Sequence, residues 1–427
     1  MRKDIPSTIL CIIVLLFLFL GGGSMIFGLS QSEKADSDSL ENETLDWRER
    51  YPFPSESPSQ KQPSQATKKV EETQEATYLS TVTEFQDKLD QQKENLLGRQ
   101  KFMELWGAFR RVTHQTKTEE VVLLNNGYLT TTVPATEEGV ATAIADSVIA
   151  LSKELQGKEI PVLYVQEPQK VCRYDDQMPP GAYSDINWNL DMHLNLLEKG
   201  NVPTLDLRES IHEDNLSHYD MFFRTDHHWK MSSGLWASEK IAEEINRRFG
   251  MDLDTSLLSA EKYREVTYEN WYLGAQGRRV TRGYISPDDF TILLPTFPTD
   301  FRVQHPDKGI DTVGDFSQVM FCWDMLNTFD LYGHSTYEAI LYGNRPLTKI
   351  TNRQCDNGKK ILLIHDSYAT AVAPFLATTC QELHMIDVRK ENGNFNGNLS
   401  AYIDEFQPDL VLFSFCSPVN IDRSKVP

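Results

Sequence analysis

Short apolar runs alternate along the chain with segments in which apolar residues return every three to four positions. The helical spacing is clear over 137–155, where Ile144 and Val148 share one stripe. The runs 160–165 and 359–364 are almost wholly apolar, which is typical of parallel strands buried on both faces. The expected strands are 121–129, 160–165, 202–207, 359–364, 383–388 and 409–415, and the expected helices are 85–111, 137–155, 186–199, 233–249, 369–379 and 399–406. Strands separated by crossover helices predict an α/β fold, a parallel sheet with helices on both faces.

The N-terminus begins with a long uncharged run, Thr8–Leu29, which is long enough to cross a bilayer as a helix. Arg2 and Lys3 precede it, so the positive-inside rule places the start of the chain in the cytoplasm and the rest outside. We therefore expect residues 1–30 to be a single-pass membrane anchor. The alternative is a secretory signal peptide, because the small residues Gly28 and Ser30 flank a conceivable cleavage point.

Two further segments depart from the α/β alternation. Residues 31–77 are rich in Ser, Glu, Gln, Lys, Pro and Thr and lack apolar periodicity, which predicts a disordered tether. Residues 256–355 are rich in Gly, Pro, Asp and aromatic residues, and we expect them to form an irregular insertion that contains some β-structure. The predicted domain therefore spans 78–427, with this insertion inside it.

Composition excludes several classes of protein. The formal net charge of −20 argues against a protein that binds the phosphates of nucleic acids, which needs a basic surface. The six cysteines show neither CxxC spacing nor a zinc-finger pattern with histidine, so no structural metal site is expected. One disulfide, between Cys322 and Cys355, is left open by the sequence.

Two short segments carry the candidate chemistry: Arg224-Thr-Asp-His-His-Trp-Lys230 before a helix, and His365-Asp-Ser-Tyr368 after a buried strand. A serine at a strand-to-helix turn is exposed at the carboxyl end of a sheet, where the next backbone N–H and the helix N-terminus are available to an oxyanion. Ser367 needs a base, and His228 oriented by Asp226 would supply one.

The sequence also leaves open other roles for the same residues. Asp366 or Ser367 is equally suited to capping a helix N-terminus. His227 and His228 could be an ordinary pair beside a buried Trp229. A metal site at these histidines and Asp226 would bring together adjacent residues, which rarely converge on one ion, and no fourth ligand is evident.

The combination T-D-H-H-W before a helix and H-D-S-Y after a strand resembles the bacterial DHHW proteins. These belong with the alginate O-acetylation proteins AlgX and AlgJ in the SGNH-hydrolase-like group. The similarity extends from roughly 85 to 414. It implies a flavodoxin-like α/β fold with a Ser-His-Asp triad, in which Asp226, His228 and Ser367 are the matching positions.

The sequence also departs from that family pattern. The glycine of G-D-S is His365 here, whose side chain would crowd the turn or contact substrate. The glycine and asparagine that complete the oxyanion hole in common SGNH enzymes have no clear counterparts. Candidates for oxyanion or substrate contacts are Tyr368, Gly274, Arg278, His227 and His365.

The resemblance implies an extracytoplasmic acyl-ester enzyme, an O-acetyltransferase that acts on a cell-surface polysaccharide. No cofactor is expected. Because the sequence shows no acetyl-CoA motif, a membrane protein would have to donate the acetyl groups. The alternatives are a carbohydrate esterase with the same triad, and a non-catalytic cell-surface protein that binds or assembles glycans.

Overall fold

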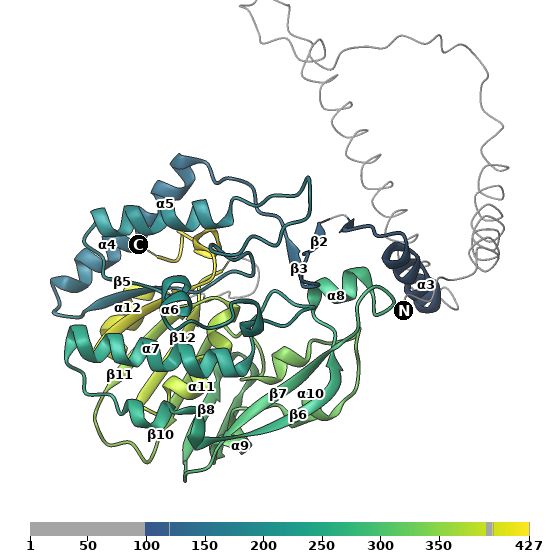
Figure 1. Ribbon diagram of the computed structural model, residues 1–427. Helices are drawn as coiled ribbons and strands as arrows, with labels where there is room; N and C mark the ends of the chain where they lie inside the picture. Colours follow the sequence, from purple (N-terminus) through teal and green to yellow (C-terminus); the bar gives the residue numbers. More distant parts are fainter. Residues whose placement is uncertain (1–98, 119, 390–394, 396, 427) are drawn as a thin grey trace, which may run out of the picture. The chain divides into compact units, whose positions relative to one another are not determined.

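The computed structural model describes residues 99–426 apart from 119, 390–394 and 396 (Figure 1). All of them lie within one compact unit, Lys88–Pro427. In this part of the chain, no helix combines the length and the apolar character needed to cross a membrane. The predicted anchor and the predicted tether lie outside the described residues.

The centre of the fold is an eight-stranded sheet with the strand order β5-β4-β13-β11-β12-β10-β8-β9. The strands from β5 to β12 in this order are parallel to one another. Their bounds are β4 Val162–Gln166, β5 Thr204–Asp206, β11 Lys360–His365, β12 Glu382–Asp387 and β13 Leu410–Phe415. Every residue of β4 and β13 is buried, as their unbroken apolar runs predict. The expected α/β fold with a parallel sheet is confirmed.

Three antiparallel strands extend the sheet beyond β12. They are β8 (Phe301–His305), β9 (Ile310–Gly314) and β10 (Leu347–Asn352), and β10 pairs with both β12 and β8. Part of the segment expected to be an irregular insertion therefore belongs to the main sheet. Burial alternates along β10, so the strand buries only one face and its sequence shows no continuous apolar run. The rest of this segment includes a two-stranded ribbon, β6 (Tyr263–Tyr272) with β7 (Asp288–Pro295).

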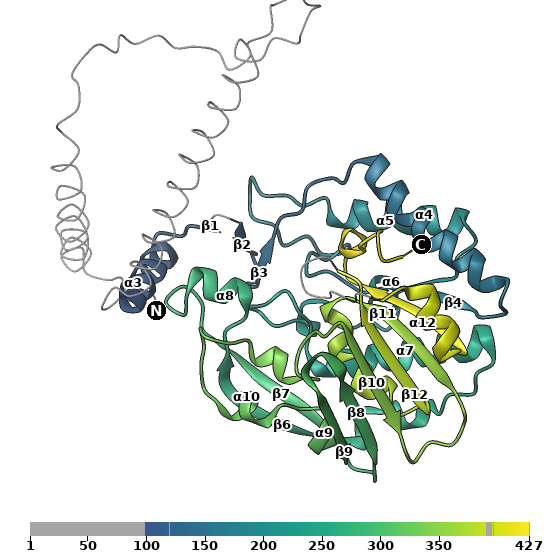
Figure 2. The same ribbon diagram turned by 180° about the vertical axis from the view of Figure 1, so that it is seen from behind.

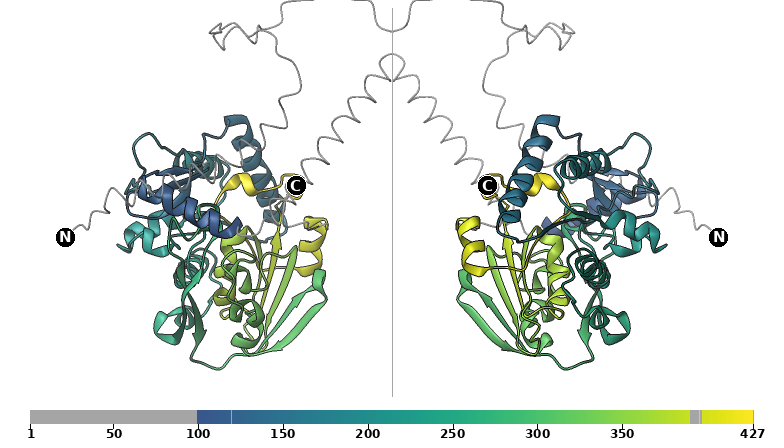
Figure 3. Two further views of the ribbon diagram at one scale, coloured as in Figure 1. Left: turned by 90° about the vertical axis from the view of Figure 1, so that its right-hand side faces the viewer. Right: turned by 90° about the vertical axis from the view of Figure 1, so that its left-hand side faces the viewer.

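Helices cover both faces of the sheet (Figures 2 and 3). One face packs against α4 (Glu138–Gln156), α5 (Ile186–Lys199) and α12 (Leu399–Phe406). The other face packs against α6 (Leu207–Glu213), α7 (Met231–Phe249) and α11 (Ala373–Leu376). Further elements are α3 (Arg99–Val112), β1 (Lys117–Thr118), β2 (Val121–Leu123), β3 (Leu129–Thr131), α8 (Ala275–Val280), α9 (Phe316–Val319) and α10 (Trp323–Asn327).

The helix expected over 369–379 is shorter and begins differently. A 3-10 helix covers Ser367–Ala371, and α11 follows it. Pro374 lies in the first turn of α11, where its missing N–H costs nothing but where it cannot continue a helix from the preceding turn. The chain therefore makes two short helical pieces after β11 in place of one long helix.

The five described cysteines, Cys172, Cys322, Cys355, Cys380 and Cys416, are all free thiols. The disulfide that the sequence left open between Cys322 and Cys355 is therefore not formed. The described fold is held by its two hydrophobic layers, without a covalent cross-link.

Candidate active site

Ser367 stands at the carboxyl edge of the parallel sheet. It follows β11, which lies between β13 and β12, and its side chain sits at the start of the 3-10 helix. Asp366 caps that helix by accepting the N–H of Tyr368 at 3.1 Å. Ser367 is 8% exposed. Ligand sites of open parallel sheets gather at this edge, because the strand ends and the turns after them converge there.

Asp226 and His228 lie in a tight loop that leads into α7. An antiparallel bridge between Phe222 and Trp229 closes the loop. Within it, Asp226 Oδ1 accepts the main-chain N–H of His228 at 3.0 Å, which fixes the turn and brings both side chains to one side.

Two hydrogen bonds of the residues next to the candidate base and serine join this loop to the turn that carries Ser367. The indole N–H of Trp229 donates to the carbonyl of Tyr368 at 2.9 Å, and the Tyr368 hydroxyl donates to the carbonyl of His227. The α7 helix also approaches the 3-10 helix closely, since a Cβ on Gly234 would lie 2.2 Å from the carbonyl oxygen of Ala371. Segments about 140 residues apart are thus held as one unit.

The structure brings Asp226, His228 and Ser367 together in a chain of hydrogen bonds. His228 Nδ1 lies 2.9 Å from Asp226 Oδ1, and His228 Nε2 lies 2.8 Å from Ser367 Oγ. With a proton on Nδ1, the imidazole donates to the carboxylate and accepts from the serine hydroxyl. This is the geometry that a nucleophile, a base and an orienting acid require.

The Asp226 carboxylate is held on its second oxygen as well. Oδ2 accepts the Tyr272 hydroxyl at 2.5 Å and the Ala275 N–H at 2.8 Å. Gly274 makes this approach possible, because a Cβ there would lie 2.2 Å from the Cβ of Asp226. The role of Gly274 is therefore to leave room for Asp226, and its own N–H donates to Thr225 Oγ1 at 2.9 Å.

The electrostatics suit a neutral base beside an ionised acid. Burial alone would raise the pKa of Asp226, but the adjacent His227 and His228 hold it well below its usual range. Burial and the charge of His227 lower the pKa of His228 to about 4, against the opposing effect of Asp226. The His228 ring also stacks on Tyr337, with ring centroids 4.1 Å apart and planes 15° apart. His228 is thus an unprotonated, sterically fixed acceptor at neutral pH.

The remaining predicted contact residues do not all face the serine. The N–H of Tyr368, expected to be open to an oxyanion, donates to Asp366, and the Tyr368 side chain is buried. His365 is buried, and its Nδ1 lies 2.6 Å from the carbonyl oxygen of Asp366. Arg278 lies on α8, half-buried. His227 is 43% exposed and lines a hollow next to the site.

Lys170 is a site residue that sequence reasoning missed. Its side chain is 2% exposed, and Nζ donates to the carbonyl of Asp226 and to Gln276 Oε1, the latter at 3.3 Å. Burial lowers the pKa of Lys170 to about 7, although Asp226 and Asp288 oppose this shift. The signal available in the sequence was its place shortly after the end of the expected strand 160–165.

A buried acid, Glu167, lies near the turn that carries Ser367. Glu167 is fully buried and its Oε1 accepts the Ser414 hydroxyl at 2.6 Å. Burial and the neighbouring Asp366 raise the pKa of Glu167 well above its usual range. Asp366 in turn accepts the N–H of Cys416 and the side-chain amide of Asn420, both at 3.0 Å. These hydrogen bonds hold Asp366, and with it the turn that carries Ser367, in place.

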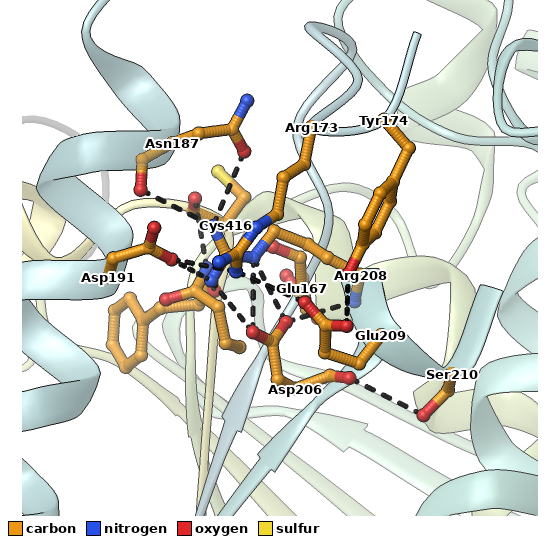
Figure 4. A network of polar contacts seen from close by, with 12 residues as sticks. Glu167, Arg173, Tyr174, Asn187, Asp191, Asp206, Arg208, Glu209, Ser210 and Cys416 are labelled. Carbon is orange, nitrogen blue, oxygen red and sulfur yellow. Dashed lines mark hydrogen bonds and ion pairs between the residues drawn. The ribbon is translucent and has the colours of Figure 1, made fainter. Parts of the chain in front are cut away.

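An ion-pair network ties together the segments after β4 and β5 (Figure 4). Arg208, 3% exposed, contacts Asp206 at 2.7 Å and Asp191 at 2.8 Å. Arg173 adds contacts of 3.0 Å to Asp191 and 3.1 Å to Glu209. Only Arg208 and Asp206 are largely buried in this network, whereas the side chains of Arg173, Asp191 and Glu209 are each more than a third exposed. The buried pair is therefore the part whose disruption would leave an uncompensated charge, and the exposed pairs contribute little.

Asp226, His227 and His228 also offer ligand atoms within 4.8 Å of one another, as a metal site would. A metal ion on His228 Nδ1 would leave the proton on Nε2, and His228 could not then accept the serine proton. The contact of Nε2 with Ser367 therefore favours use of the histidine as a base. We do not identify these residues as metal ligands.

A comparison with known protein families shows which family part of this chain matches. Residues 127–273 match the family described as SGNH hydrolase-like domain, acetyltransferase AlgX. This part of the chain is therefore similar to an AlgX-type SGNH hydrolase-like domain. The matched segment contains Asp226 and His228, and it ends before Ser367.

Solved structures of other proteins are similar to this chain in fold. Bacillus cereus PatB1 with a sulfonyl adduct is 17% identical with a TM-score of 0.58, over 73% of this chain and 99% of that one. A DHHW family protein from Eubacterium siraeum is 18% identical with a TM-score of 0.54, over 73% of this chain and 95% of that one. Comparison with curated proteins gives no match. At these identities the structural similarity concerns the fold alone.

Proposed function

We propose that the chain is an acyl-ester enzyme, an O-acetyltransferase that modifies a cell-surface polysaccharide. The observation that carries the proposal is the continuous hydrogen-bonded chain from Asp226 through His228 to Ser367. The match to a family described by acetyltransferase activity agrees with it. The buried surroundings of His228 keep it neutral, which is the form that a general base needs.

The first half of the reaction forms an acetyl-enzyme. Ser367 Oγ attacks the carbonyl carbon of a bound acetyl ester while His228 Nε2 takes the hydroxyl proton. The imidazolium so formed is stabilised by the Asp226 carboxylate at 2.9 Å. When the donor C–O bond breaks, the leaving oxygen takes that proton, and the acetyl group stays on Ser367.

The second half transfers the acetyl group to the acceptor. A sugar hydroxyl gives its proton to His228 Nε2, its oxygen attacks the acetyl carbon, and Ser367 Oγ leaves and recovers the proton. Water in place of the sugar would turn the same sequence of steps into ester hydrolysis. The acceptor therefore decides between a transferase and an esterase.

The cellular setting is part of the proposal. The apolar run Thr8–Leu29, preceded by Arg2 and Lys3, would anchor the chain with its enzymatic part outside the cytoplasm. Residues 31–77 would let that part reach polymer near the membrane. A membrane protein would supply the activated acetyl groups there.

The test uses the full chain with a chromogenic acetyl ester, with and without oligosaccharides. We expect ester cleavage by the wild type, acetylated oligosaccharide detected by mass, and loss of both in Ser367→Ala. Ser232→Ala is the matched control, because Ser232 is an exposed serine on α7. If the ester is cleaved but no oligosaccharide becomes acetylated, the result would support the esterase. If the ester is not cleaved at all, the result would support the non-catalytic protein.

A further inference from the structure

Lys170 is a buried lysine whose hydrogen-bond partners carry no charge. Its side chain is 2% exposed, and it lies in the segment that follows β4. Nζ donates to the main-chain carbonyl of Asp226 and to Gln276 Oε1, the latter at 3.3 Å. Burying an ammonium group is costly, and neutral acceptors offset that cost less well than a carboxylate in contact would. Stability alone therefore does not explain a lysine at this position.

The two acceptors belong to the two segments that hold the Asp226 carboxylate. The Asp226 carbonyl lies in the loop that also carries His228. Gln276 lies on α8, next to Ala275, whose N–H donates to Asp226 Oδ2 at 2.8 Å. One side-chain nitrogen thus ties the loop to α8, and both of its hydrogen bonds act on the residue that orients the base.

The surroundings of Lys170 confine Nζ at this junction. Nζ lies 6.0 Å from the centroid of the Tyr128 ring. Burial lowers the pKa of Lys170 to about 7, and the charges of Asp226 and Asp288 oppose this shift. Asp288 also holds the residue before Asp226, since its Oδ2 accepts the N–H of Thr225 at 2.8 Å and the Thr225 hydroxyl at 2.7 Å. Because Lys170 is buried, it acts through its hydrogen-bond partners and not through contact with substrate.

We propose that Lys170 is a positioning residue, which holds Asp226 in the place from which its carboxylate orients His228 toward Ser367. This rests on the proposed function. Asp226 Oδ1 lies 2.9 Å from His228 Nδ1, so a displaced Asp226 main chain moves the carboxylate and with it the ring that accepts the serine proton. A displacement of about 1 Å in an active site can cost about 100-fold in rate.

The first variant is Lys170→Met in the full chain. Methionine has a side chain of similar length and no donor, so the cost of burying a charge disappears together with both hydrogen bonds. We expect a folded protein with a Tm close to that of the wild type, in which kcat/KM for a chromogenic acetyl ester falls about tenfold or more, mainly through kcat. Lys199→Met replaces an exposed lysine in the last turn of α5 and is the matched control, which should keep the wild-type kinetics.

A double-mutant cycle separates positioning from a general structural role. If Lys170 acts through Asp226, Lys170→Met should have little further effect on kcat/KM in an Asp226→Asn background, because the carboxylate that it positions is already gone. Equal fold losses in the two backgrounds would overturn the proposal. Wild-type kcat/KM in a folded Lys170→Met would overturn it as well.

A second variant covers the case in which Lys170→Met does not fold. Gln276→Met removes the acceptor on α8 and should lower kcat/KM by a smaller factor, which again disappears in Asp226→Asn; a loss of equal size in both backgrounds would overturn the proposal. If the wild type cleaves no ester, the proposed function fails instead. Proton NMR of the His228 Nδ1 proton then tests the positioning: we expect both variants to shift this signal, and an unchanged signal in the folded variants would overturn the proposal.

Discussion

At the scale of single residues, the site depends on how many donors meet one carboxylate. Asp226 is approached by the N–H and the ring of His228, by His227, by the Tyr272 hydroxyl and by the Ala275 N–H. Hydrogen bonds to an ionised group contribute about 1.5–3 kcal/mol each, so Tyr272→Phe should lower kcat/KM about tenfold or more. It should also move the acid limb of the pH profile upward, because the carboxylate loses a donor that favours its charged form.

Tyr268→Phe is the matched control for this change, because Tyr268 lies on the same strand, β6, and is only half-buried. Steady-state kinetics across pH, together with thermal unfolding of each variant, would separate a loss of positioning from a loss of folding. An unchanged pH profile in a folded Tyr272→Phe protein would mean that the tyrosine does not act on Asp226.

At the scale of elements, the site depends on how closely α7 packs against the turn that carries Ser367. Gly234 permits this contact, since a Cβ there would meet the carbonyl oxygen of Ala371 at 2.2 Å. Gly234→Ala should therefore cost about 1–3 kcal/mol of stability and should reduce activity more than the stability loss explains. The reason is that α7 and the loop before it move together away from the serine turn.

Gly139→Ala provides the comparison for that substitution. Gly139 lies in α4, and a Cβ there meets nothing within 4 Å. Its replacement should leave activity unchanged and raise stability by up to about 1 kcal/mol through helix propensity. Urea unfolding and kcat/KM measured on both variants would test the account, and equal behaviour of the two would count against a packed α7 contact.

At the scale of the whole molecule, buried neutral histidines should make the fold sensitive to acid. Burial lowers the pKa of His193, His218, His228 and His305 to about 4, and that of His384 to about 3. In the unfolded chain these histidines bind protons near pH 6.5, whereas in the folded protein they stay neutral until about pH 4. The free energy of unfolding therefore falls as the pH falls from about 6.5 to about 4. Each fully buried histidine contributes about 3 kcal/mol to this loss.

The fully buried His193 allows a direct check of this expectation. Its ring packs against Tyr164, with centroids 5.1 Å apart. His193→Phe keeps an aromatic ring and removes the titrating group, so its Tm should fall less between pH 6.5 and pH 4 than that of the wild type. Equal slopes of Tm against pH for the two proteins would show that His193 does not contribute.

The sequence was most informative where a local pattern determines the structure. Unbroken apolar runs predicted β4 and β11, and the two motifs placed Ser367 and His228 next to the ends of elements. It was least informative where a residue acts through distant packing. Tyr272 and Lys170 reach Asp226 only because β6 and the segment after β4 are folded against its loop, and no local spacing encodes such contacts. The half-buried strand β10 was missed for a related reason, since its partners β12 and β8 decide which face is covered.

The proposed function depends on Ser367 being an activated nucleophile with His228 as its base. The most direct measurement is mass spectrometry of the full chain after reaction with a serine-directed sulfonyl fluoride. We expect one adduct on Ser367 in the wild type and in Ser232→Ala, none in Ser367→Ala, and strongly slowed labelling in a folded His228→Ala. Equal labelling of the wild type and Ser367→Ala, or no labelling of any of these proteins, would contradict it.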